Sequence, residues 1–262
     1  MVIPLHDDNP TDRFPFVTVA IIAACVFIYF FVQPHSGVDQ RLGTSKDTAF
    51  TLERAAIPCE LEQREPLTVA EANRQSCSTS LESNSPRIFP DKNVWLAVIF
   101  SMFLHGSILH LGGNMLFLWI FGNNVEEHFG HVGYIVFYFV AGIAAMGAHY
   151  LGDPSSTQPV IGASGAIAGV MGAYLVLWPR ARVLTVIALL FFLPIYLPAG
   201  ILLAIWFGTQ FLTAVNPNTG VAWLAHVGGF AFGALVALAL RPLIPPKRRV
   251  QPSQPPDWRW GR

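Results

Sequence analysis

Long apolar segments separated by short polar connections dominate the hydropathy pattern of this chain. A helix needs about 20 apolar residues to cross a bilayer, and fewer where neighbouring protein shields it. The pattern predicts six membrane-spanning helices, at residues 16–32, 107–123, 131–151, 159–178, 198–212 and 222–240. We therefore expect an all-α polytopic membrane protein, a six-transmembrane-helix bundle with a long loop between helices 1 and 2.

Two apolar segments do not fit this simple pattern. The run from residue 94 to 122 is too long for one helix, and "FLHGSILHLGGN" interrupts it, so we expect residues 94–104 to form an interfacial or re-entrant piece. Residues 183–197 are apolar but follow "PRAR" and contain Pro194. We expect them to lie along or dip into the membrane interface, with a seventh crossing as the alternative.

The chain divides into three regions. Residues 1–15 form a predicted cytoplasmic N-terminal segment, residues 16–241 the membrane domain with an extracytoplasmic loop at 35–92, and residues 242–262 a basic, proline-rich cytoplasmic tail. No small-residue cleavage site follows the first apolar run, which favours an uncleaved anchor. The short connections "GDPSSTQP" and "NPNTG" carry no Lys or Arg, so they are expected outside, with both termini inside. A bacterial cytoplasmic (inner) membrane is the simplest assumption.

The composition is that of a membrane protein and limits the classes of binding partner to be expected. Of the 262 residues, 53% are hydrophobic and only 12% are charged. This apolar composition predicts the lipid bilayer as partner. Sixteen basic and sixteen acidic residues cancel, so no nucleic-acid partner is expected. Cys59 and Cys77 share the long loop, where they form either a disulfide or two free thiols, and the three cysteines have no metal-binding spacing.

Four polar side chains fall at one depth of the predicted bundle. Ser164 and His226 each lie about five residues into a span that runs inward, roughly 7 Å below its start. His110 and Asn114 lie at a similar depth in the second span. Polar side chains at membrane depth are costly and face the protein interior or a cavity. Their common depth predicts a site.

Glycines are spaced so that two of these helices can approach closely. Gly165 and Gly169 form one GxxxG pair beside Ser164, and Gly229 and Gly233 form another below His226. Small residues at this spacing let membrane helices pack backbone to backbone. We expect this contact to bring the serine within reach of the histidine.

Each of these features also has a purely structural interpretation. A serine in G-x-S-G can bond back to its own helix, and a membrane histidine or an Asn/His pair can join helices. The acidic residues decide among mechanisms, because all sixteen fall outside the predicted spans, which disfavours proton-coupled transport and aspartyl proteolysis. What remains suits acyl transfer: His226 as base for Ser164, with His110, Asn114 and a backbone N–H as oxyanion donors.

The segments "HGSILHLGGN", "GASGAIAG" and "AHVGGFAFG" resemble three motifs of the rhomboid intramembrane serine proteases, H-x-x-x-x-H-x-x-x-N, G-x-S-G-x-x-x-G and A-H-x-x-G-x-x-x-G. "NVEEHFG" is similar to a further feature of that family. The resemblance implies a serine endopeptidase with Ser164 as nucleophile and His226 as general base, and with Asn114 and His110 near the oxyanion. It also implies structural support by a set of motif residues: His105, Gly162, Gly165, Gly169, Gly229, Gly233 and Glu126.

The family resemblance further implies transmembrane protein substrates cut in or near the membrane, access between spans two and five, and no metal or cofactor. Two positions depart from the pattern. The residue four after the serine is often aromatic in that family and here is Ala168, and Trp95 lacks an adjacent Arg. A non-catalytic rhomboid-like protein that binds membrane clients is the alternative, and a small transporter or channel is a third, disfavoured by the missing intramembrane acid.

Overall fold

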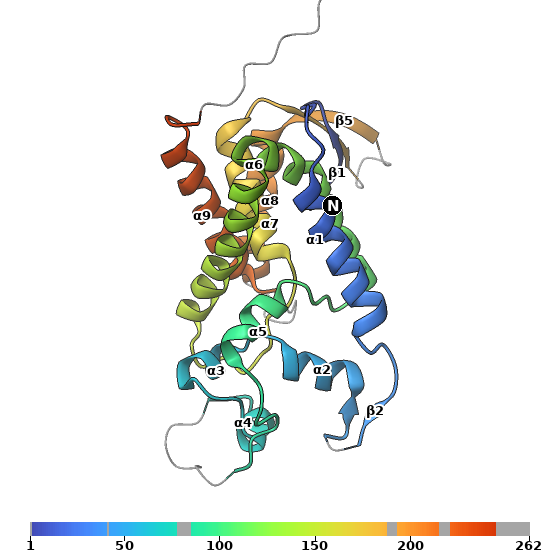
Figure 1. Cartoon of the computed structure of the whole chain (residues 1–262), viewed down its shortest axis with the longest axis vertical. Helices are drawn as coiled ribbons and strands as arrows, with labels where there is room; N and C mark the ends of the chain where they lie inside the picture. The colour runs from blue at the N-terminus through green and yellow to red at the C-terminus, as the bar shows by residue number, and fades with distance from the viewer. Residues whose placement is uncertain (1, 41, 78–84, 188–192, 215–220, 245–262) are drawn as a thin grey trace, which may run out of the picture.

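A computed structural model describes residues 2–40, 42–77, 85–187, 193–214 and 221–244 (Figure 1). Most of them are helical. The helices are α1 (Phe16–Phe27), continued by the π-helical η1 (Ile28–Val32), α2 (Lys46–Arg54), α3 (Pro58–Gln63), α4 (Val69–Arg74), α5 (Val94–Ser101), α6 (Ile108–Gly152), α7 (Ser164–Leu177), α8 (Ala199–Ala214) and α9 (Trp223–Leu240). The strands are β1 (Val2–Asp7), β2 (Val38–Asp39), β3 (Thr44–Ser45), β4 (Arg182–Ile187) and β5 (Leu193–Pro198).

The longest helix, α6, is two helices joined at Gly130. Gly130 has φ 72°, a left-handed conformation that glycine adopts without the steric cost other residues meet. The halves, 108–129 and 131–152, correspond to the second and third predicted spans, and each is about 33 Å long at 1.5 Å per residue. The first half begins where the Ser107 side chain accepts a hydrogen bond from the His110 N–H, 3.1 Å away.

Glu126, on the first half of α6, caps a different helix. No side chain caps α1 locally, because Pro15 precedes it. Instead the buried Glu126 carboxylate accepts hydrogen bonds from the N–H groups of Val17 (2.9 Å) and Thr18 (2.8 Å) and from the Thr18 hydroxyl (2.7 Å). A carboxylate at a helix N-terminus accepts hydrogen bonds from N–H groups that lack partners in the helix. It also interacts favourably with the positive end of the helix dipole. This contact fixes the start of α1 against α6.

Large apolar side chains cover the outward faces of the long helices. They are Phe16, Phe27, Phe30 and Phe31 on α1 and η1, Trp119, Val132, Ile135, Val136 and Val140 on α6, Ile201, Ile205, Phe211 and Leu212 on α8, and Leu235 and Leu238 on α9. Ile108–Gly152 and Trp223–Leu240 are long and apolar enough to cross a membrane, and Phe16–Val32, Ser164–Leu177 and Ala199–Leu212 are shorter apolar helices. An exposed apolar belt of this kind suits contact with lipid.

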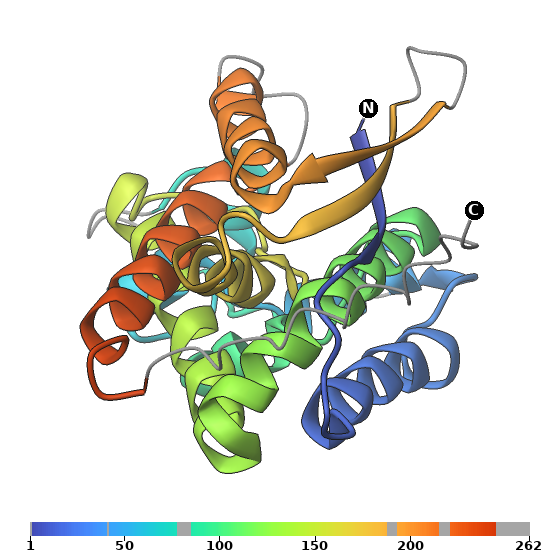
Figure 2. The same ribbon diagram turned by 90° about the horizontal axis from the view of Figure 1, so that it is seen from above.

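The central helix is α7, which packs between α6 and α9 (Figure 2). Nearly all of its residues are buried although it has only 14 of them, about 21 Å of helix. On α9, a Cβ at Gly229 would lie 2.1 Å from the Gly165 carbonyl oxygen, and one at Gly233 would lie 1.8 Å from that of Gly169. The two backbones therefore touch where side chains would ordinarily separate them.

The expectation of an all-α chain is wrong at one end of the bundle. Strands β1, β4 and β5 form an antiparallel sheet in that order, in which residues 183–197, expected to lie along the interface or to cross the membrane, contribute a strand pair (Figure 2). Val183 and Thr185 are buried while Leu184 and Val186 are only half-buried, the period-two pattern of a strand. Pro194 is accommodated because β5 is an edge strand. Residues 1–15 supply β1.

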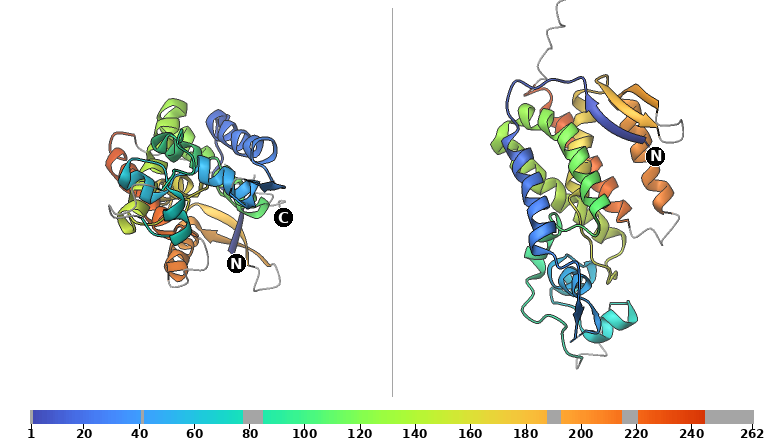
Figure 3. Two further views of the ribbon diagram at one scale, coloured as in Figure 1. Left: turned by 90° about the horizontal axis from the view of Figure 1, so that it is seen from below. Right: turned by 90° about the vertical axis from the view of Figure 1, so that its right-hand side faces the viewer.

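The loop at 35–92 folds at the opposite end of the bundle from this sheet (Figures 1 and 3). It contains α2, α3, α4 and the short β2–β3 pair around a small core of Ile57, Cys59 and Leu67. Cys59 and Cys77 form a disulfide, which decides between the two states expected for them. Closing this loop, with a sequence separation of 18, is worth about 3 kcal/mol on chain-entropy arguments.

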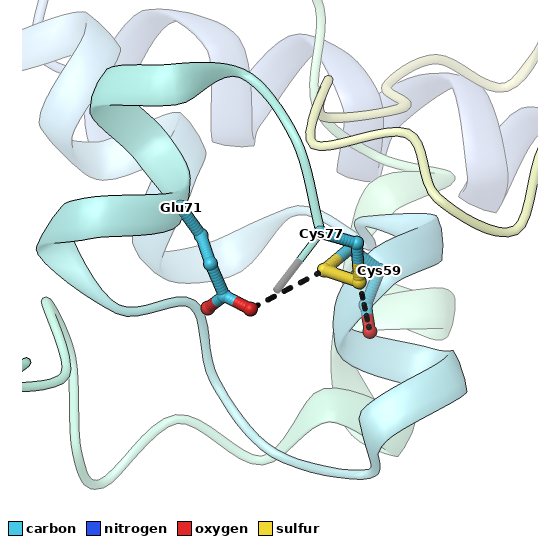
Figure 4. A group of neighbouring side chains, drawn as sticks. All are labelled: Cys59, Glu71 and Cys77. Atoms are coloured by element: carbon cyan, nitrogen blue, oxygen red, sulfur yellow. Dashed lines mark hydrogen bonds between the residues drawn. A yellow bond between two sulfur atoms is a disulfide. The ribbon is translucent and has the colours of Figure 1, made fainter. Parts of the chain in front are cut away.

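Figure 4 shows the Glu71 carboxylate beside this disulfide. The ligand atoms of Cys59, Glu71 and Cys77 lie within 4.8 Å of one another. A thiolate metal site would need the two sulfurs that the disulfide already uses. Glu71 also closes the capping box of α4, where it accepts hydrogen bonds from the Thr68 N–H (2.8 Å) and hydroxyl (2.9 Å). The cluster therefore stabilises the loop.

Candidate active site

Ser164 and His226 meet at the helix crossing that the glycines permit. Ser164 is the first residue of α7 and His226 lies in the first turn of α9. His226 Nε2 and Ser164 Oγ are 2.8 Å apart, within hydrogen-bond distance. A hydroxyl and an imidazole are thus in contact, an arrangement that can activate a serine.

The predicted depth of Ser164 within its helix is wrong. Residues 159–163 are not helical, because their backbone pairs with other segments. The N–H of Val160 donates to the Ala56 carbonyl and that of Gly162 to the Ser101 carbonyl, each at 2.8 Å. Since α7 begins at Ser164 itself, the first N–H groups of the helix have no partner inside it and lie at the end that carries Ser164.

The other two predicted site residues lie on the first turns of α6. Gly162 has φ +118°, and a Cβ there would lie 2.8 Å from His110 Nε2, so the site needs glycine at this position. Asn114 is buried, and its Nδ2 has no hydrogen-bond partner among the residues that the structure describes. A buried donor of this kind costs folding free energy unless a bound group accepts a hydrogen bond from it.

These side chains line one cavity of about 760 Å³. It lies between the starts of α6, α7 and α9 and the end of α8, and its walls are mostly apolar. The site residues on its lining are His110, Asn114, Gly162, Ser164, Trp206, Gln210 and His226. An apolar cavity with a few convergent polar groups is the usual form of a binding or catalytic site.

Sequence reasoning missed Gln210, on α8. Its Oε1 lies 2.7 Å from His226 Nδ1, on the side of the imidazole away from Ser164. The Trp206 ring also faces His226, with centroids 5.7 Å apart. A signal was present: glutamine is strongly polar and lies in a largely apolar predicted span, where polar side chains usually have a function.

His105 takes no part in the contact between Ser164 and His226. Its backbone is held by Gln33, whose Oε1 accepts from the His105 N–H and whose Nε2 donates to the His105 carbonyl, each at 3.0 Å. The buried His105 ring packs edge-on against His110, with centroids 5.1 Å apart. This pairing positions the turn that leads into α6.

Ala168, at the position where an aromatic residue is often found, is fully buried in α7. The His226 ring is contacted by α8, since Trp206 and Gln210 both lie on that helix. Residues 206 and 210 are four apart and therefore share one face of that helix.

Comparison with known proteins identifies the family. A family model described as the Rhomboid domain matches residues 92–243. The chain is 33% identical over 162 residues to RHOMBOID-like protein 12, mitochondrial, of Arabidopsis thaliana, covering 55% of this chain and 46% of that protein. It is 32% identical over 152 residues to Rhomboid protein 1, mitochondrial, of Saccharomyces cerevisiae, covering 53% and 40%.

A bacterial relative is also similar. The chain is 33% identical over 148 residues to Rhomboid protease GluP of Bacillus subtilis, covering 56% of this chain and 26% of that protein. Each match covers less than half of the relative's own length. Because the Rhomboid domain accounts for more than half of the 262 residues, this chain belongs to the rhomboid family and is an integral membrane protein with a helical polytopic fold.

Proposed function

We propose that this protein is an intramembrane serine endopeptidase that cleaves membrane-protein substrates through a Ser164–His226 dyad. The observation that carries the proposal is the 2.8 Å contact between Ser164 Oγ and His226 Nε2 inside a largely apolar cavity. A serine hydroxyl becomes a competent nucleophile when an adjacent base takes its proton. The name of the Bacillus subtilis relative, a rhomboid protease, supports the same reaction class.

Acylation begins when Ser164 Oγ bonds to the carbonyl carbon of the scissile peptide and its proton passes to His226 Nε2. The carbonyl oxygen becomes an oxyanion, for which the unpartnered Asn114 Nδ2, the first N–H groups of α7 and His110 are the proposed donors. The C–N bond then breaks, and Nε2 returns the proton to the departing amine.

Deacylation reverses these roles. Water gives a proton to His226 Nε2 and its oxygen bonds to the ester carbon. The bond from carbon to Ser164 Oγ then breaks, and Oγ recovers the proton from Nε2. The products are an amine and a carboxylic acid, and both residues return to their starting states.

The proposed topology keeps six crossings, at α1 with η1, both halves of α6, α7, α8 and α9, with the β1–β4–β5 sheet on the inner side. The disulfide supports placing the loop at 35–92 in an oxidising compartment. The cavity belongs to the same side, since Val160 beside Ser164 pairs with Ala56 of this loop.

Because two of the relatives are mitochondrial, they do not support a bacterial inner membrane in particular. Most of the tail at 242–262 lies outside the described residues.

A fluorophosphonate probe tests the dyad directly in detergent-solubilised protein. We expect the wild type to be labelled, and Ser164→Ala and His226→Ala each to lose both labelling and cleavage of a reporter transmembrane substrate. The two losses should not add, because the residues act as one unit. Thermal melting should stay near that of the wild type for Ser164→Ala, since one small side chain replaces another.

Ser155→Ala, in the exposed connection before α7, is the matched control and should be labelled like the wild type. Retained cleavage in either dyad variant would refute the assignment. A wild type that resists labelling where a known rhomboid protease reacts would also refute it, in favour of a non-catalytic client-binding role.

A further inference from the structure

We propose that Gln210 is a positioning residue that holds His226 in the one neutral tautomer able to act as a base toward Ser164. This inference rests on the proposed function and adds a third member to the dyad. It is based on the hydrogen bonds of the Gln210 amide, on its burial, and on the position of α8 against the first turn of α9.

The amide oxygen determines where the imidazole proton must be. Gln210 Oε1 lies 2.7 Å from His226 Nδ1, and a carbonyl oxygen can only accept a hydrogen bond. Nδ1 must therefore carry the proton. In a neutral imidazole the lone pair is then on Nε2, the nitrogen that lies 2.8 Å from Ser164 Oγ.

The reversed orientation of the amide is disfavoured by the other partners of its nitrogen, one of which is the Thr209 hydroxyl at 3.3 Å. Gln210 Nε2 donates to the Trp206 carbonyl oxygen at 3.1 Å, one turn earlier on α8. Rotating the amide by 180° would place Oε1 against that carbonyl, so that two acceptors would face each other. Gln210 is only 6% exposed, so bulk water cannot relieve the mismatch. The backbone of α8 thereby dictates which amide atom faces His226.

A neutral partner differs from the carboxylate of a Ser–His–Asp triad. It selects the tautomer and the ring orientation without adding a negative charge beside the imidazole. It also restrains a ring that has no aromatic neighbour at position 168, where the side chain is Ala168. Gln210 and Trp206 together supply this restraint from one face of α8.

Two substitutions at position 210 distinguish the effect of the hydrogen-bond acceptor from that of side-chain size. Gln210→Leu keeps the size and removes the acceptor, and we expect the labelling rate and kcat to fall on the order of 10², with KM and thermal melting little changed. Gln210→Glu restores an acceptor, so its plateau rate should stay within a few-fold of the wild type.

The pH profile gives a readout that a merely structural role would not move. A carboxylate at position 210 favours the charged imidazolium, so the acidic limb of the labelling profile of Gln210→Glu should move to higher pH. His110 and His149, both on α6, are the other titratable groups that act on His226 among the described residues, and they are unchanged in the variant. Leu212→Ala, on the exposed face of α8, is the matched control and should have the wild-type profile.

Nitrogen-15 NMR of histidine-labelled protein reads the tautomer without requiring activity. We expect the Nδ1–H form of His226 in the wild type and a mixture of tautomers in Gln210→Leu. Wild-type labelling rates in Gln210→Leu, identical pH profiles for Gln210→Glu and wild type, or an Nε2–H tautomer in the wild type would each overturn the proposal. A wild type that does not react with the fluorophosphonate probe but shows the Nδ1–H form would instead refute the protease assignment. It would leave intact the role of Gln210 in fixing the tautomer.

Discussion

At the scale of single residues, Asn114 has a buried amide that the proposed mechanism uses. Its amide is buried in the cavity lining, and Nδ2 has no partner among the described residues. We expect Asn114→Ala to lower the rate of reporter cleavage by on the order of 10²–10³, because the variant lacks one of the donors that we propose for the oxyanion. Thermal stability should hold or rise, since a buried donor without a partner costs about 1–3 kcal/mol.

Single-turnover cleavage measures this effect apart from substrate binding. Asn123→Ala, on the same helix but outside the cavity lining, is the control and should cleave at the wild-type rate. An unchanged rate in Asn114→Ala would remove it from the oxyanion role.

The sequence can point to residues such as Asn114 and His226 because polar groups are costly at membrane depth. Gln210 is equally polar, but its role depends on which face of α8 is directed toward His226, and the sequence of α8 alone does not decide this.

At the scale of elements, the crossing of α7 and α9 depends on glycines that leave no room for a Cβ. We expect Gly233→Ala to separate the two helices and to lower both thermal stability and labelling, because its Cβ would meet the Gly169 carbonyl oxygen at 1.8 Å. Forced overpacking of this kind typically costs 1–3 kcal/mol or more. Thermal melting in detergent, followed together with probe labelling, measures the loss.

Gly112→Ala is the matched control, because a Cβ on that α6 residue meets nothing within 4 Å. It should be neutral or slightly stabilising, as alanine is the better helix former by about 1 kcal/mol. Equal stability of the two variants would contradict close backbone packing at this crossing.

The GxxxG spacing was readable in the sequence, whereas the start of α7 at Ser164 was not, because it depends on the pairing of residues 160 and 162 with other segments.

At the scale of the whole molecule, a buried ion pair joins α3 to the end of the loop at 35–92, where the chain leads into α5. Glu60 on α3 and Lys92, just before α5, lie 2.5 Å apart and both side chains are almost fully buried. Burial raises the pKa of Glu60 and lowers that of Lys92, which disfavours the charged form of each side chain. The contact between the two side chains acts in the opposite sense and favours both charged forms. Lys92→Met should cost about 3–5 kcal/mol at neutral pH, because it leaves the carboxylate buried without its cation.

The sign of the pH dependence follows from the raised pKa of Glu60. Its folded-state pKa lies above the unfolded value, so the folded state binds the proton more tightly and gains stability as pH falls. Lys92→Met removes the contact that lowers the pKa of Glu60, so this pKa rises further in the variant, and its melting deficit should shrink as pH falls from neutrality. Glu60→Gln combined with Lys92→Met should recover most of the loss. A double variant no more stable than Lys92→Met would contradict this account.

The sequence by itself determined the apolar helices, the family and the residue types of the site, because burial in lipid and close helix packing leave local patterns that one chain displays. Only the tertiary structure decided that β4 pairs with both β1 and β5 in one sheet, that Cys59 bonds to Cys77, and that Gln210 meets His226. The sheet and the contact of Gln210 with His226 depend on how the long helices are arranged in space, and the disulfide depends on how the loop at 35–92 folds.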